Sequence, residues 1–557
     1  MTREGGTWRS EHYSRYLWVL IAALAVAASI TGLRNGFAFD DVDVIIKNPR
    51  LHTFAAPWGL LVETYWRAEM GSMLYRPMTM VVFAAQWVVG GGSPLPFHLT
   101  SILLYAALSV AVYRLAILLM PARAAFVSAA LFAVHPVHVE AVANIVGQAE
   151  LWVALLLVVL VAWYVWIRRA GPLRTSHIAL ISVGYLIACG FKEHAIVLPA
   201  LLLAAELLVV GDERPLRARV RNLIPLCIAM AITGLAFLAA RYAVLDGVAI
   251  DSRAQILKEQ PFGTRFFTML DVVVEWVRLF FWPMSLSADY SYPRIRTHTT
   301  FEISMLPAVA VLAGIAWIAW AVRKRLPVVT FGISWTGLAL LIPSNLIVVT
   351  GFVLAERTLL LATVGFVLCA GVAVHEALTA ADRSGGIARP LAVSALGALL
   401  LVFAGRSVTR SPVWRDNETL VLQTVRDVPS SHRAHWMRAA DLAGKKRTAE
   451  ALDEMDLAVA LGRRDDPLLL AYGGDMFAMA GRCPRALTLY RRALALAPGN
   501  IQLRVNTSWC LLNVGKLEEA KAMALDAGGN AGDIRLQEVA RAADSLQLVR
   551  ARKLASR

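Results

Sequence analysis

Long apolar runs separated by short polar segments fill the first three quarters of the chain. A helix needs about 20 apolar residues to cross a bilayer, and about eight runs are long enough by themselves. Together with somewhat shorter runs they predict about eleven transmembrane helices, near 16–33, 98–118, 123–137, 150–168, 177–191, 195–210, 222–243, 304–322, 328–349, 358–377 and 389–405. We therefore expect an all-α membrane bundle over residues 1–410.

Two further apolar segments do not fit as full spans. Segment 76–90 is short, and segment 265–284 carries Asp271, Glu275 and Arg278. Charges at mid-membrane are costly and usually face protein or water. We interpret both segments as interfacial or re-entrant helices on the outer face.

From residue 411 the pattern changes to that of a water-exposed helical domain, 411–545. Segment 467–500 carries small, aromatic and proline positions at the spacing of a 34-residue tetratricopeptide repeat, with flanking units near 431–465 and 501–534. The positions that carry this register are Gly474, Phe477, Gly481, Ala486, Tyr490, Ala493 and Pro498, then Gly515, Ala520 and Ala527, and before them Trp436, Gly444, Ala451 and Ala458. About three repeats would form a C-terminal α-solenoid. Such arrays usually bind peptides or proteins, and a packing module is the alternative.

Composition agrees with a membrane protein. Of 557 residues, 58% are hydrophobic and 17% charged, whereas soluble domains are about a quarter charged. The formal charge of +15 does not indicate nucleic-acid binding, because the basic residues gather at helix ends, as the positive-inside rule requires. Arg3, Arg9 and Arg15 begin this pattern, which places the N-terminus inside and the C-terminus outside; no small-residue cleavage site follows the first apolar run.

The five cysteines have no CxxC spacing. Three of them fall in apolar spans, so we expect neither a zinc site nor a disulfide framework.

The topology places an acidic pair in the first outer loop, 34–97. Asp40 and Asp41 directly follow the first span in FAFDDVDVIIKNPRLH, residues 37–52. Adjacent carboxylates at a membrane surface suit a general base or a metal ligand. A solvated loop at the helix end is the simpler alternative.

A second polar segment, HPVHVEAVANIVGQAE, covers 135–150 between two spans. Polar residues interrupt apolar sequence there, namely His135, His138, Glu140, Asn144, Gln148 and Glu150. His138 and Glu140 are candidate metal ligands, although no complete ligand set is visible. His135, His138, Glu140 and Glu150 are the ones we single out. They are candidates for a substrate site, and a histidine on an apolar face is more often part of a hydrogen-bonded core than a metal ligand.

Cations stand at further outer helix ends. Lys192 and Glu193 lie in FKEH, Arg357 in AERT and Arg76 in YRPMT. Each cation either reaches lipid headgroups or grips the phosphate of a lipid-linked substrate.

A large outer loop adds Asp289 and Tyr290. With the acidic pair and the cations it would complete the outer face of a transferase that uses a phospholipid-linked donor. A carboxylate deprotonates the acceptor hydroxyl, and the cations stabilise the departing phosphate.

The ordered motifs resemble a known family. FAFDDVDVIIKNPRLH, SMLYRPMTMVVF, LFAVHPVHVEAVANIVGQAELW, FKEHAIVLPALLLAAELL and AERTLLLATVGF, followed by a repeat array, are similar to the transmembrane and tetratricopeptide-repeat O-mannosyltransferases of the C-type glycosyltransferase superfamily. The resemblance implies inverting transfer of mannose from polyprenyl phosphate to Ser or Thr hydroxyls of a protein. It also implies Asp40 as the base with Asp41 beside it, and Lys192, Arg357 and Arg76 at the donor phosphate. This mechanism requires no cofactor, and the sequence does not decide whether a divalent cation is bound.

The chain departs from the family's motif at one informative position. The family usually has GRAE where this chain has GQAE, so Gln148 stands in place of a cation. We expect a distant bacterial member in the inner membrane, with its repeats in the periplasm; a eukaryotic chain would place them in the ER lumen.

Two other functions fit parts of the pattern. A non-catalytic membrane scaffold would use the repeats to recruit partners. A transporter would show charges inside its spans and a repeat among them, neither of which the sequence has.

Overall fold

The computed structural model describes residues 16–67, 74–211, 214–245, 257, 260–384, 387–462, 466–525 and 533–555. Arg3, Arg9, Arg15 and Ala527 lie outside these residues. The chain divides into two compact units. We call residues 1–291 with 295–420 the membrane unit, and residues 421–557 with 292–294 the C-terminal unit. No strand occurs in the described part of either unit, so the all-α prediction is confirmed.

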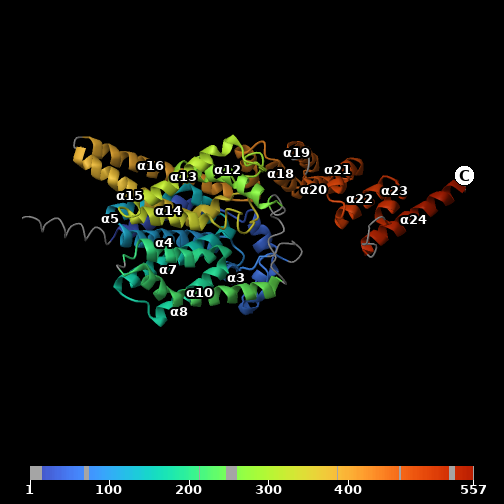
Figure 1. Cartoon of the computed structure of the whole chain (residues 1–557). Helices are drawn as coiled ribbons and strands as arrows, with labels where there is room; N and C mark the ends of the chain where they lie inside the picture. Colours follow the sequence, from blue (N-terminus) through green and yellow to red (C-terminus); the bar gives the residue numbers. More distant parts are fainter. Residues whose placement is uncertain are drawn as a thin grey trace, which may run out of the picture. The chain divides into compact units, whose positions relative to one another are not determined.

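The membrane unit is built from fourteen described helices of five or more residues, besides short 3₁₀ and π turns (Figure 1). They are α2 (Leu17–Ser29), α3 (Pro77–Gly90), α4 (Leu95–Leu119), α5 (Ala122–Val134), α6 (Val139–Ala143), α7 (Gln148–Ala170), α8 (Thr175–Phe191), α9 (Leu198–Leu208), α10 (Leu216–Leu245), α12 (Phe262–Phe281), α13 (Leu306–Val322), α14 (Pro327–Leu340), α15 (Leu360–Ser384) and α16 (Ala388–Arg410).

Seven helical segments of the described chain are long and apolar enough to cross a membrane, and a bent pair would make eight. The chain is therefore a multi-pass membrane protein. Each of the eleven predicted spans contains a helix, but four of those helices are short or bent. Segments 76–90 and 265–284 form α3 and α12, and neither is among the seven.

Burial within the membrane unit separates core helices from lipid-facing ones. Helix α4 packs against α2, α5 and α7, and 61% of its apolar window is buried. The windows of α13 and α16 are only 11% buried. Because their exposed surface is apolar, these two helices are suited to face lipid.

A bend between α5 and α6 positions the polar segment of the bundle. The two helices are inclined by 47°, and Pro136 stands at the break, where it cannot donate a backbone hydrogen bond. The chain then passes through α6 and a 3₁₀ turn (Ile145–Gly147) before α7 begins. All of 135–150 is buried, so this polar segment lies inside protein.

The C-terminal unit consists of paired antiparallel helices. After α17 (Asn417–Asp427), which crosses the boundary between the units, these are α18 (His432–Gly444), α19 (Thr448–Leu461), α20 (Pro467–Met479), α21 (Cys483–Leu496), α22 (Ile501–Asn513), α23 (Leu517–Leu525) and α24 (Ile534–Ala555). Successive helices from α18 to α22 pack on one another. At Gly474 a Cβ atom would lie 2.3 Å from the Tyr490 ring, so only glycine allows α20 and α21 to cross this closely.

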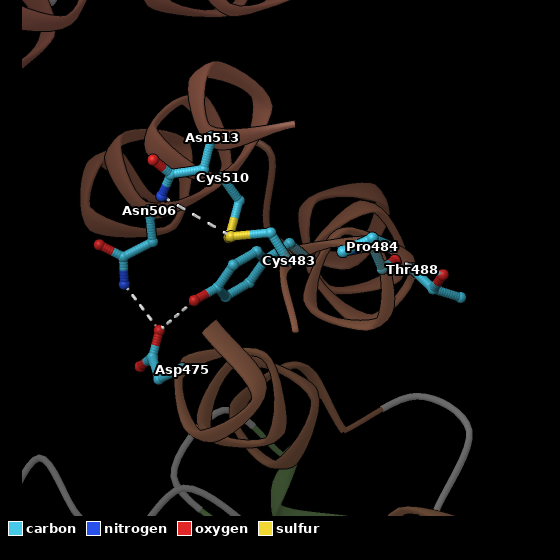
Figure 2. Close-up of a disulfide and its surroundings, with 8 residues drawn as sticks. Asp475, Cys483, Pro484, Thr488, Asn506, Cys510 and Asn513 are labelled. Carbon is cyan, nitrogen blue, oxygen red and sulfur yellow. Dashed lines mark hydrogen bonds between the residues drawn. A yellow bond between two sulfur atoms is a disulfide. The ribbon is translucent and has the colours of Figure 1, made fainter. Parts of the chain in front are cut away.

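One expectation about the cysteines was wrong. Cys483 and Cys510 form a disulfide that joins α21 to α22 (Figure 2). Asp475, on α20, accepts hydrogen bonds from Tyr490 of α21, at 2.6 Å, and from Asn506 of α22, at 2.7 Å. Sequence spacing did not reveal the disulfide because the two cysteines come together only when the helices pack.

Replacing both disulfide cysteines with serine should destabilise the C-terminal unit. The disulfide closes a loop with a sequence separation of 27, and the chain-entropy relation gives about 3–4 kcal/mol for a loop of that length. Urea unfolding of the full chain, followed by tryptic cleavage within 421–557, measures the loss. Cys227→Ser, at an exposed free cysteine, is the control. Equal urea midpoints for the double variant and the control would contradict the prediction.

Candidate active site

The acidic pair begins at a strained residue. Phe39 has a φ of 56°, a region that side chains with a Cβ rarely adopt, and its backbone N–H donates to Asn417 at 2.5 Å. Asp40 and Asp41 follow directly. Asp40 is partly exposed, whereas Asp41 is 1% exposed. The two adjacent carboxylates therefore have different surroundings.

Asp41 is an anchor within the protein. Its carboxylate accepts backbone N–H bonds from Ala38, at 3.2 Å, from Ile145, at 3.4 Å, and from Val146, at 2.9 Å. These bonds fix the first loop to the turn before α7. Burial raises the pKa of Asp41 to about 7, although the three N–H groups act against this shift. Both of its oxygens are committed to the fold.

Arg357 is held by Glu140. The Glu140 carboxylate accepts from the backbone N–H of Arg357 at 3.0 Å and from its guanidinium. Both side chains are buried, and the guanidinium lies 4.5 Å from the centre of the Phe352 ring. Removing one partner of such a pair typically costs about 3–5 kcal/mol, because the other charge stays buried. Arg357 also interacts electrostatically with Asp40 and Glu150.

Lys192 and His194 share a second carboxylate. The Lys192 ammonium donates to one oxygen of Glu150, and His194 Nδ1 lies 3.1 Å from the other. Burial lowers the pKa of Lys192, and the nearby Arg76 and Arg357 add to this, whereas Glu150 opposes it. Lys192 therefore lies among other cations and depends on Glu150 to stay charged.

Glu193 connects two arginines. It accepts from Arg76 at 3.0 Å and from Arg241 at 3.3 Å. Burial raises the pKa of Glu193, but the two arginines outweigh burial and hold it below its usual range. Arg76 also lies 5.0 Å from the centre of the Tyr65 ring. Arg241 and Tyr65 were not predicted, because neither belongs to a recognisable motif.

These groups form one charged cluster. Electrostatic interactions link Asp40 to Arg357, Arg357 to Lys192 and Glu150, and Arg76 to Lys192 and Glu150. The charged cluster consists of Asp40, Arg76, Glu140, Glu150, Lys192, Glu193, Arg241 and Arg357. Its four cations each form an ion pair with Glu140, Glu150 or Glu193, and the eight members comprise four basic and four acidic groups. The structure thus brings most of the predicted site residues together.

The remaining predicted residues have different roles in the structure. His135 lies 3.0 Å from the Phe280 carbonyl, and His138 bonds to Tyr105 at 2.8 Å, so both are buried core histidines. Tyr290 donates to Glu356 at 2.6 Å, and Glu356 interacts electrostatically with Glu140. Asp289 holds the backbone and hydroxyl of Ser291. In the described residues no group of three or more His, Cys, Asp or Glu side chains is placed to hold a metal.

Gln148 makes its hydrogen bonds to residues outside the charged cluster. Its amide donates to the Phe97 carbonyl at 3.1 Å and to Ser101 at 3.2 Å, and it accepts from Gln86 at 2.9 Å. The departure from GRAE to GQAE therefore places a buried amide network where the family's motif has a cation.

Several buried polar atoms near the acidic pair have no hydrogen-bond partner among the described residues. They include Asn48 Nδ2, the Tyr65 hydroxyl and both polar atoms of the Asn144 amide. A buried polar atom without a partner costs about 1–3 kcal/mol, and such atoms are uncommon in folded proteins. At Gly147 a Cβ would lie 2.7 Å from the Ala141 carbonyl oxygen, so the turn that carries Asn144 is tightly closed.

Comparison with known proteins confirms the resemblance that the motifs indicate. The chain is 24% identical over 553 residues to mouse Protein O-mannosyl-transferase TMTC3, a match that covers 90% of this chain and 58% of that protein. It is 25% identical to mouse Protein O-mannosyl-transferase TMTC4, covering 78% and 64%, and 26% identical to fruit-fly Protein O-mannosyl-transferase Tmtc1, covering 80% and 61%. The chain thus spans about three fifths of the length of these relatives. No protein-family model matches it.

A solved structure gives a weaker match. The archaeal oligosaccharyltransferase AglB from Archaeoglobus fulgidus, in complex with an inhibitory peptide and a dolichol-phosphate, superposes with a TM-score of 0.43 at 14% identity. The match covers 73% of this chain and 56% of that one. A similarity this slight carries no conclusion about the site.

Asp41 should make the stability of the protein depend on pH. Its pKa is about 7 in the folded chain and has the ordinary value of 3.8 in the unfolded chain, so between these values only the folded chain binds the proton. Stability contributed by Asp41 is therefore present below pH 4 and lost as pH rises through 7, by about 4 kcal/mol. Asp41→Asn removes this loss.

Thermal unfolding of the detergent-solubilised protein at pH 5 and pH 8 measures the effect. The variant should lose less stability between the two values than the wild type does. Asp43→Asn, which removes an exposed carboxylate paired with Lys47, is the control. The same pH dependence in wild type and Asp41→Asn would show that Asp41 does not titrate in this range.

Proposed function

We propose that the chain is a membrane glycosyltransferase that transfers mannose from a polyprenyl-phosphate donor to Ser or Thr hydroxyls of a protein, with inversion at the anomeric carbon. The observation that carries this proposal is the charged cluster, in which a partly exposed carboxylate, Asp40, lies in the field of buried Arg357. The relatives named protein O-mannosyl-transferases support the same reaction.

Asp40 is the base. Asp41 cannot easily take this role, because it is fully buried and three backbone N–H groups occupy its oxygens. Asp40 is more accessible, and it interacts electrostatically with Arg357. Asp40 accepts the proton of the acceptor hydroxyl as that oxygen bonds to the anomeric carbon.

Lys192, Arg357 and Arg76 hold the donor phosphate. When the bond between the anomeric carbon and the phosphate oxygen breaks, its electron pair stays on the phosphate. The cations stabilise that charge, so no general acid is required. Glu140, Glu150 and Glu193 fix these cations in place before the substrate arrives. A single displacement by the acceptor oxygen inverts the anomeric carbon.

The helices of the C-terminal unit bind the protein acceptor as a tetratricopeptide-type array and lie outside the cytoplasm. The disulfide between Cys483 and Cys510 supports the second statement, because disulfides persist in oxidising compartments such as the periplasm or the ER lumen. The inner membrane of a bacterium with the array in the periplasm satisfies this requirement.

Asp40→Asn should abolish transfer and leave the protein folded. The variant keeps the shape of the side chain and loses the base, so we expect kcat to fall by at least about 100-fold. The measurement is release of polyprenyl phosphate from polyprenyl-phosphate mannose in the presence of acceptor peptide. Asp43→Asn, three residues further on, should change the rate by less than about twofold. Full activity in Asp40→Asn would overturn the assignment of the base.

The compartment of the C-terminal unit can be tested in intact cells. A variant with Cys189, Cys227 and Cys369 replaced by serine keeps only the disulfide pair. A membrane-permeant maleimide should leave this variant unmodified until it is reduced, because an oxidising compartment keeps the pair closed. Modification of both thiols without reduction would place the unit in the cytoplasm.

A further inference from the structure

We propose that Tyr65 and Asn144 bind the sugar of the lipid-linked donor and thereby determine which sugar is transferred. This inference rests on the proposed function and extends it to the part of the donor that the charged cluster does not recognise. Neither residue has been assigned a role in the reaction by the motifs or the charges.

Tyr65 lies beside the predicted base and phosphate ligands. Its ring packs in one apolar cluster with Val44 and Ile45, which follow the acidic pair, and its face receives Arg76 at 5.0 Å. Its hydroxyl interacts electrostatically with Arg76, Asp40, Asp41 and Arg357. Burial raises the pKa of Tyr65 above its usual range, so the hydroxyl keeps its proton and can donate a hydrogen bond.

Asn144 directly precedes the two residues that donate to Asp41. Its backbone N–H donates to the Glu140 carbonyl, and the two residues that follow it, Ile145 and Val146, donate to Asp41. Ile145 and Val146 also belong to the apolar cluster that contains Tyr65. The segment that carries Asn144 and the loop that carries Tyr65 are therefore packed together around Asp41.

Both side chains are buried and unused by the protein. Tyr65 is 1% exposed and Asn144 is 0% exposed. Among the buried amides of the described residues, Asn144 is the one whose oxygen and nitrogen both lack a partner. Gln86 provides the contrast, because its amide nitrogen donates to Gln148. Buried polar groups are normally satisfied, so we infer that a ligand with matching polar groups pairs with these two side chains beside the proposed base.

A sugar matches these groups better than the other parts of the substrates. Each sugar hydroxyl both donates and accepts, as the Tyr65 hydroxyl and the Asn144 amide together do. The polyprenyl chain has no polar groups, and the phosphate is an anion suited to Lys192, Arg357 and Arg76. The acceptor presents its hydroxyl to Asp40. A site built around hydroxyl groups also rejects sugars that lack them, because its own polar atoms then stay unpaired.

The test compares two ligands that differ only in the sugar. Binding of polyprenyl-phosphate mannose and of polyprenyl phosphate to the purified full chain is measured by thermal shift across ligand concentrations, together with transfer to an acceptor peptide. In Tyr65→Phe and Asn144→Leu we expect the Kd for the mannose-bearing lipid to rise by about tenfold. The Kd for polyprenyl phosphate should change by less than about twofold.

A matched tyrosine separates this role from a structural one. The Tyr75 hydroxyl donates to the Leu61 carbonyl at 2.7 Å, so Tyr75→Phe should lower the melting temperature and leave the ratio of the two affinities unchanged. Tyr65→Phe should leave the melting temperature unlowered and change the ratio of the two affinities, because the Tyr65 hydroxyl has no protein partner to lose. Tyr65→Phe also keeps the test valid if Asn144→Leu fails to fold.

The possible outcomes are distinct. An unchanged ratio of the two affinities in Tyr65→Phe and Asn144→Leu would overturn the inference. An equal loss of affinity for both lipids would also overturn it, as would a defect confined to use of the acceptor peptide. A wild-type protein that binds both lipids equally would also overturn it while leaving the phosphate site intact. A wild-type protein that distinguishes the two lipids but transfers nothing would overturn the proposed function and support the sugar site. Binding of neither lipid by the wild type would overturn both.

Discussion

The site depends on the pairing of buried charges across distant parts of the chain. Glu140 and Arg357 are separated by 217 residues, and Glu193 and Arg76 by 117. A single charge in a low-dielectric interior is very costly, so each of these carboxylates requires its cation and each cation its carboxylate. The bend at Pro136, the turn at Gly147 and the loop after α2 all bring these partners within hydrogen-bond distance. The surrounding helices can therefore differ in length and exposure. The segments that carry the paired charges cannot move relative to one another without breaking an ion pair.

The sequence predicted the helices better than it predicted their contacts. Apolar runs are local features, so each predicted span contains a helix, and the polar residues at the helix ends were correctly selected as notable. The partners of those residues were not predictable, because pairing depends on how helices pack. His135 and His138, for example, lie in one motif with Glu140, yet they bond to core groups and only Glu140 joins the charged cluster. Tyr65 and Arg241 were missed because a lone tyrosine in a loop and a lone arginine in a helix give no signal in one sequence.

The same reasoning explains the cysteines and Gln148. A spacing of 27 residues between Cys483 and Cys510 has no meaning until α21 and α22 lie side by side. Gln148 appeared to replace a cation at a ligand position, but its amide is satisfied by Gln86, Phe97 and Ser101. In both cases the residue type marked the position as unusual, and only the packing of the helices showed which bond the side chain forms.

The equal number of acidic and basic groups in the charged cluster has a consequence for turnover. Arg357, Lys192 and Arg76 each have a carboxylate partner within the protein, so in the proposed reaction the departing phosphate would not meet an unpaired cation. The carboxylates would compete with that phosphate for the same hydrogen-bond donors. Such competition would limit how tightly the spent lipid is retained and would favour its release from the site.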